Sequence, residues 1–179
     1  GTVVEFLGDG LMAVFGAPEA LPRHAHAAVE AAREVAATVR AIALAPDDSR
    51  PGGSTPIAVG VGVASGRAFV GNVRTNDRLV YTAIGDVVNL ASRIERLTRE
   101  LDAAVAIDAR THRDAGTAGD GFRRHPAVPI RGRSEAVDVW TLSAGGGPTL
   151  VPGDALSLVD TNALVYAMPA MSVSVLVPQ

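Results

Sequence analysis

Apolar positions recur at helical spacing between residues 87 and 101, directly after a short apolar run. The run from Val80 to Ile84 is rich in strand-forming residues, and Gly85 interrupts it. Asp86 stands where a helix N-cap is expected. The steps of three and four residues that follow predict a buried stripe on an amphipathic helix, formed by Val87, Leu90, Ala91, Ile94, Leu97 and Leu101.

The polar side of this predicted helix carries Asn89 and Arg93. Residues four apart on a helix are neighbours, so the amide and the guanidinium project toward the same place. Such a pair suits the sugar and phosphate edges of a nucleotide, but the same pattern is also typical of a solvated helix face. The helix pattern alone leaves both interpretations open.

Two short apolar runs and one long helix are predicted in the first quarter of the chain. Residues 2–7 and 11–15 flank Gly8-Asp9-Gly10, and this spacing predicts a β-hairpin. The alanine-rich residues 24–45 have apolar positions at helical spacing. We expect this helix to cover one face of a sheet.

The middle of the chain and the part after residue 102 predict further strands. Residues 56–65 alternate at period two, which indicates a strand, and residues 67–73 look like its hairpin partner. Strands are also predicted at 103–107 and 137–142, with a short helix over 108–115. The elements up to residue 142 therefore form one predicted domain of mixed helices and strands.

The segment from residue 143 to residue 179 does not follow this pattern. It opens with a Gly145-Gly146-Gly147 run, which predicts a flexible linker. Residues 161–179 carry no charge, but Pro169 near their middle favours a short hairpin over residues 163–177 rather than a membrane span. We predict a linker and an apolar tail of unknown role.

Composition narrows the classes of partner and chemistry. A chain of 179 residues with 47% hydrophobic content can bury one core, and a net charge of −3 gives no reason to expect nucleic acid or an anionic membrane as partner. All 16 basic residues are arginine, and the absence of cysteine excludes disulfides, thiolate zinc sites and cysteine nucleophiles. The second residue already belongs to an apolar run without a signal peptide, so we expect a cytoplasmic domain truncated at its N-terminal end.

Several motifs together resemble class III nucleotidyl cyclases of the bacterial type. They are GTVVEFLGDGLMAVFGAP at the start, VGVGVASGRAFVGNV in the middle, YTAIGDVVNLASRIE at residues 81–95 and Ile-Arg-Gly-Arg at residues 130–133. The resemblance covers about residues 1–142. It implies an α/β (α+β) ferredoxin-like fold, with a mostly antiparallel central sheet, helices on one face of it and the first strand missing.

The resemblance implies a metal site at the first hairpin. In the family, a hairpin aspartate and a second aspartate on the preceding strand hold two Mg²⁺ or Mn²⁺ ions, and Asp9 matches the hairpin aspartate. The matching position of the second aspartate would lie before Gly1. One carboxylate cannot hold two ions, so we expect this chain by itself to have little or no cyclase activity.

The resemblance also implies roles for substrate-binding residues. Asn89 would orient the ribose and Arg93 would stabilise charge developing on the α-phosphate of the nucleotide. Arg131, with Arg133 second, matches the basic residue of the family that contacts the triphosphate. Arginine can replace lysine there because its guanidinium also binds phosphate, as a fork rather than a point charge.

Glu5 and Thr82 match the two positions that read the purine base. A lysine at the first position with aspartate or threonine at the second is typical of adenine recognition, whereas a glutamate with a cysteine or similar residue is typical of guanine recognition. A carboxylate accepts hydrogen bonds from guanine N1 and N2 and cannot donate to adenine N1. The chain is mixed, so we favour ATP slightly and keep GTP nearly level.

In this family the active site forms between two subunits, one of which gives the metal and base-reading residues of the hairpin and the other the asparagine and arginine. We therefore expect a head-to-tail homodimer with two equivalent sites. A non-catalytic cyclase-homology module that binds nucleotide or a partner is the competing interpretation. A palm-type diguanylate cyclase shares the sheet plan, but its Gly-Gly-(Asp/Glu)-Glu-Phe turn does not occur in this chain.

Overall fold

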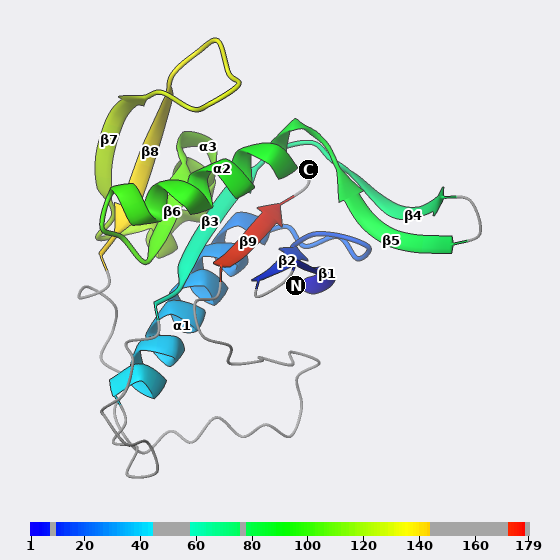
Figure 1. Ribbon diagram of the computed structural model, residues 1–179, viewed down its shortest axis with the longest axis horizontal. Helices are drawn as coiled ribbons and strands as arrows, with labels where there is room; N and C mark the ends of the chain where they lie inside the picture. The colour runs from blue at the N-terminus through cyan, green and yellow to red at the C-terminus, as the bar shows by residue number, and fades with distance from the viewer. Residues whose placement is uncertain (8–9, 45–57, 76–77, 144–171, 178–179) are drawn as a thin grey trace.

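One mixed β-sheet forms the centre of the protein (Figure 1). The computed structural model describes residues 1–7, 10–44, 58–75, 78–143 and 172–177. Within these residues seven strands form the sheet, in the spatial order β1 (Thr2–Leu7), β2 (Gly10–Val14), β9 (Ser172–Val177), β3 (Gly60–Ser65), β6 (Val105–Asp108), β8 (Val137–Leu142) and β7 (Arg123–Val128). Strands β2, β9, β3 and β6 run parallel to one another, and β1, β8 and β7 add antiparallel pairs at the two edges. The predicted hairpin of residues 2–15 and the mixed α+β fold class are confirmed.

Helices cover both faces of this sheet. Helices α1 (His24–Leu44) and α3 (Ala109–Ala115) pack on one face, and α3 runs into the short 3₁₀ helix η1 (Gly116–Gly119). Helix α2 (Asp86–Glu100) packs on the opposite face, against β3, β6 and β9. The expectation that helices occupy only one face is therefore wrong.

Helices cover both faces of the sheet because its central strands are apolar on both faces. On β3, Val61 and Val63 point toward α1 while Ala64 packs on the side of α2, and all three are fully buried. Both faces of the strand therefore have to be covered. Gly62 brings the strand close to α2, because a Cβ at residue 62 would stand 2.4 Å from the carbonyl oxygen of Ala91.

Strands β4 (Phe69–Thr75) and β5 (Arg78–Ile84) form a separate antiparallel sheet, which extends from the body as an arm (Figure 1). Their register runs from Phe69 opposite Ile84 to Thr75 opposite Arg78. The predicted hairpin between residues 56–65 and 67–73 is wrong. Strand β3 pairs with β6 on one side and with β9 on the other, so neither of its edges is open to β4.

The C-terminal segment contributes the strand β9, which lies between β2 and β3 and is parallel to both. The hairpin predicted over residues 163–177 falls largely outside the described residues, and its last six residues pair with the main sheet instead. In the part of the chain that the structure describes, every helix is too short or too polar to cross a bilayer.

Candidate nucleotide site

Helix α2 places Asn89 and Arg93 on the side facing away from the sheet. Its apolar stripe, predicted from the sequence, is buried against β3 and β6. Asn89 is exposed and Arg93 is half-buried, one turn further along the helix. The predicted orientation of the helix is confirmed, and its polar side is available to a ligand.

The start of α2 differs from the prediction. The N-cap residue is Gly85, and Asp86 is the first residue of the helix. A Cβ at residue 85 would stand 3.0 Å from the carbonyl oxygen of Arg67, so the chain turns at the residue that has no side chain. The Asp86 carboxylate faces Arg133, with Oδ2 2.9 Å from the guanidinium Nη2.

A tight turn between β7 and β8 approaches the outer side of α2. Ile130 is buried, and its carbonyl accepts a hydrogen bond from the amide of Arg133 at 3.0 Å. Gly132 has φ of 78°, a conformation that favours glycine. A Cβ at residue 132 would stand 3.1 Å from Nη2 of Arg93, so the Arg93 guanidinium lies directly against this turn.

A pocket of about 560 Å³ lies between α2 and the turn, and Arg93 and Arg131 both line it. Helix α2 contributes Arg93, Arg96, Leu97 and Glu100, and the turn contributes Pro129, Ile130, Arg131 and Gly132. Three arginines and one glutamate are among the lining residues, so the net charge of the lining is positive. Guanidinium groups bind phosphate oxygens through paired N–H donors, and this pocket therefore suits a polyphosphate.

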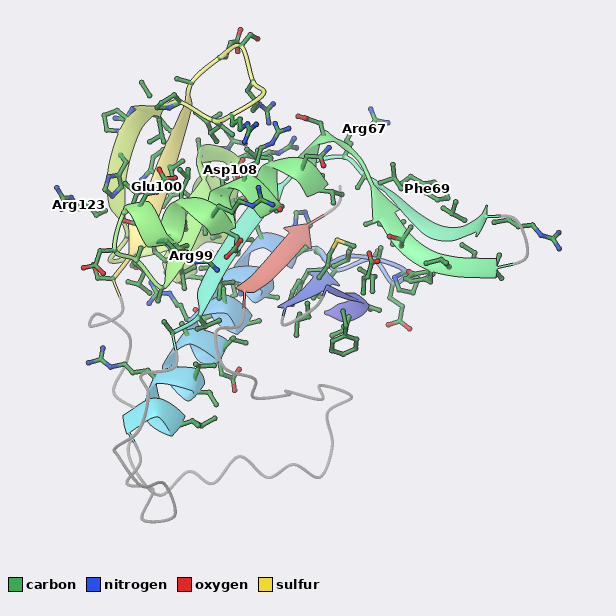
Figure 2. All side chains as sticks on the ribbon, viewed as in Figure 1. Arg67, Phe69, Arg99, Glu100, Asp108 and Arg123 are labelled. Carbon is green, nitrogen blue, oxygen red and sulfur yellow. The ribbon has the colours of Figure 1, made fainter. Side chains whose placement is uncertain are left out.

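Arg96 and Glu100 belong to this pocket but were not among the predicted site residues. Arg96 follows Arg93 by three residues, and Glu100 follows Arg96 by four, so helical spacing places all three on neighbouring positions. Figure 2 shows Glu100 near the C-terminal end of α2. Helical spacing places Arg96 and Glu100 near Arg93, but it does not indicate that the 129–133 turn lies beside them.

Comparison with known proteins decides the family. A sequence model of the adenylate and guanylate cyclase catalytic domain matches residues 2–143. The chain belongs to this family. The resemblance seen in the motifs is confirmed, and β9 lies outside the matched residues of this cyclase domain.

Named relatives and one solved structure are similar to this cyclase domain. The terminal-differentiation specific adenylate cyclase of Dictyostelium discoideum is 32% identical over 148 residues, which are 81% of this chain and 7% of that protein. Adenylate cyclase 1 of Rhizobium meliloti (strain 1021) is 33% identical over 140 residues, 78% of this chain and 20% of that protein. The crystal structure of the guanylyl cyclase Cya2 is 28% identical, with a TM-score of 0.50 over 79% of this chain and 68% of that one. The cyclase domain thus spans a small part of these two adenylate cyclases.

The residues predicted to read the base lie on neighbouring strands. Glu5 is on β1 and Thr82 is on β5, where Thr82 pairs with Gly71 of β4. Strands β1 and β5 contact each other, and both side chains are half-buried. Neither residue lines the pocket of Arg93 and Arg131.

The predicted metal ligand Asp9 lies outside the described residues. Among the residues that the structure describes, no three metal-ligating side chains gather in one place. The buried carboxylate of Asp108 is already engaged, because its Oδ1 accepts hydrogen bonds from the amides of Ser65 at 3.3 Å and Thr111 at 3.0 Å. The metal-binding role of Asp9 stays a prediction, which rests on the preference of Mg²⁺ and Mn²⁺ for carboxylate ligands.

Proposed function

We propose that this cyclase domain converts a purine nucleoside triphosphate to the 3′,5′-cyclic nucleotide and pyrophosphate, for intracellular signalling. The observation that carries the proposal is the shared pocket of Arg93 and Arg131 between α2 and the 129–133 turn. Two arginines from separate segments can hold neighbouring phosphates of one ligand at the same time. The family of the chain supplies the reaction class.

The reaction needs an in-line attack and no protein nucleophile. The ribose 3′-oxygen forms a bond to the α-phosphorus, the bond from that phosphorus to the β-phosphate oxygen breaks, and pyrophosphate leaves with the electron pair while the hydroxyl proton passes to solvent. Arg131 would hold the triphosphate and Asn89 would orient the ribose. Arg93 would stabilise the charge that develops on the α-phosphate oxygens.

Asp9 would hold the metal ions of this site. Mg²⁺ or Mn²⁺, two ions in a complete family site, would lower the charge on the phosphate oxygens when bound. Because Asp9 is one carboxylate where the family uses two, we expect little or no turnover from the 179-residue chain alone. A polypeptide extended by the strand that precedes this segment in the family, here called the extended polypeptide, would supply the second.

A head-to-tail homodimer would complete two equivalent sites, each with Asp9 from one protomer and Arg93 from the other. The β4–β5 arm supports a partner, because large apolar side chains on it are exposed: Phe69 by 57%, Leu79 by 67% and Ile84 by 53%. Figure 2 shows Phe69 on this arm. A two-stranded sheet is at best marginally stable alone, and exposed apolar patches mark interaction surfaces. A second copy of the chain would cover this arm.

We propose ATP as the substrate, with GTP a nearly equal alternative. Thr82 favours adenine by family pattern, whereas the Glu5 carboxylate can accept hydrogen bonds from guanine N1 and N2. Turnover of both nucleotides by the extended polypeptide, with and without Glu5→Lys, tests the choice. A shift of substrate preference toward ATP in Glu5→Lys supports recognition of the base by Glu5. An unchanged preference would mean that other residues recognise the base.

The second candidate function is a non-catalytic module that binds nucleotide to regulate a partner, which Glu5 mildly favours. Measuring nucleotide binding and cyclic nucleotide formation on the same sample separates the two. Product formed by the extended polypeptide, together with pyrophosphate in equal amount, supports the enzyme. Tight binding without product supports the module.

A further inference from the structure

The Asp86 carboxylate performs a task other than the capping that its place in the sequence indicates. Gly85 takes the N-cap position, and Asp86 Oδ2 lies 2.9 Å from Nη2 of Arg133. The Arg133 side chain is mostly enclosed, with 29% of its surface exposed, and its buried Nη1 has no hydrogen-bond partner among the residues that the structure describes. The ion pair therefore joins the first residue of α2 to the turn that carries Arg131.

The turn is held to the rest of the protein through one residue before Arg131 and one residue after it. Ile130 is buried in the core. Arg133 is held both by the hydrogen bond that its amide donates to the Ile130 carbonyl and by its ion pair with Asp86. Between these residues Gly132 presents its backbone to the Arg93 guanidinium. Loss of the Asp86 contact would leave Arg133 held only by the hydrogen bond from its amide to Ile130, which lies within the turn itself, so Arg131 and the surface under Arg93 would both move more freely.

We propose that Asp86 and Arg133 are positioning residues, which hold the 129–133 turn so that Arg131 and Arg93 face one polyphosphate. This inference rests on the proposed function, because it assigns the ion pair to the same pocket. Asp86 bears a negative charge beside a pocket for an anion. If charge alone mattered, its removal would tighten anion binding, whereas loss of positioning weakens it.

The two explanations predict opposite signs, which calorimetry can measure with inorganic tripolyphosphate and with ATP on the full chain. We expect Asp86→Asn to weaken binding about fivefold, the scale of an exposed ion pair. Asp102→Asn is the matched control, since it removes one exposed carboxylate at the other end of α2. Binding that is unchanged or tighter in Asp86→Asn overturns the inference.

A double-mutant cycle tests whether the two residues act together. Arg133→Gln should weaken binding at least as much as Asp86→Asn, and the combination should be no worse than Arg133→Gln alone. Additive losses would overturn the coupling. Circular dichroism of each variant confirms that it is folded.

Hydrogen exchange separates failure of the inference from failure of the proposed function. In Asp86→Asn the amide of Arg133, bonded to the Ile130 carbonyl, should exchange several-fold faster than in the wild type, with or without a ligand. No polyphosphate binding by the wild type would reject the proposed function, while faster exchange would still support the role of the ion pair. Unchanged exchange at Arg133 would reject the inference on its own.

Discussion

The Arg93 guanidinium lies against the backbone of Gly132, so close that a Cβ at residue 132 would stand 3.1 Å from Nη2 and the guanidinium would have to shift. A residue on α2 and a residue in the turn between β7 and β8 thus form one wall of the candidate phosphate pocket. The requirement for glycine has two sources here: φ is 78° and Arg93 occupies the space beyond.

These two sources can be separated with a matched pair of variants. Gly121 also has positive φ, 81°, but a Cβ there would meet no atom of the described part of the chain within 4 Å. Alanine at either position should cost about 1–2 kcal/mol of unfolding free energy through backbone strain. Only Gly132→Ala should also weaken ATP binding, by displacing Arg93, and calorimetry checks this. Equal loss of affinity in both variants would contradict the contact.

Removal of the Arg93 guanidinium should affect turnover more than substrate affinity. Its proposed task is to stabilise charge that develops in the transition state, and such a loss typically costs about 10²–10³ in kcat. Steady-state kinetics of Arg93→Ala and Arg93→Lys in the extended polypeptide measure the effect. Comparable changes in kcat and KM would indicate a general binding role instead.

Elements with a strong period were predictable from the sequence. The apolar stripe from Val87 to Leu97 predicted α2, and these positions are the ones that one side of the helix buries. The spacing of two apolar runs around Gly8-Asp9-Gly10 predicted the β1–β2 hairpin. Residue spacing placed Asn89 and Arg93 on one side of α2, whereas their proposed roles came from the resemblance to the family. The site residues of the turn came from the motif Ile-Arg-Gly-Arg rather than from any periodicity.

Pairing between strands was not predictable, because it depends on which edges are free. Strand β4 pairs with β5 because β6 and β9 occupy both edges of β3. The apolar sequence around Ser172–Val177 does not indicate which strands this segment pairs with in the sheet. The sequence predicts a cap at Asp86 because local spacing does not indicate its partner, Arg133, which is 47 residues further along the chain, the difference between 133 and 86.

The exposed apolar side chains of the arm should control association of the protein. The double substitution Phe69→Glu and Leu79→Glu places charge on the proposed contact. The variant dimer should therefore dissociate at concentrations where the wild type remains dimeric. Sedimentation velocity measures this. Ile42→Glu is the control, because Ile42 is 44% exposed on α1, away from the arm. A wild-type protein that is monomeric throughout would contradict the proposed interface.

Stability should decrease at mildly acidic pH because of His24. Burial lowers the pKa of His24 below its ordinary value of 6.5, while the nearby Asp114 raises it and Arg110 lowers it further. A lowered pKa means that the folded protein binds fewer protons than the unfolded chain, so the unfolding free energy falls as pH decreases through 6.5 toward the folded-state pKa. Urea unfolding of His24→Gln should show a weaker pH dependence in this window than the wild type. An identical dependence would assign the effect to other groups.

Mixing two inactive variants tests most directly whether Asp9 and Arg93 act on one nucleotide from different protomers. Asp9→Asn and Arg93→Ala, each prepared in the extended polypeptide, should have little cyclase activity alone. Random exchange makes half of the dimers mixed, each with one intact site of two, so the mixture should recover about a quarter of wild-type activity. No recovery in a mixture that sedimentation shows to contain mixed dimers would contradict the shared site.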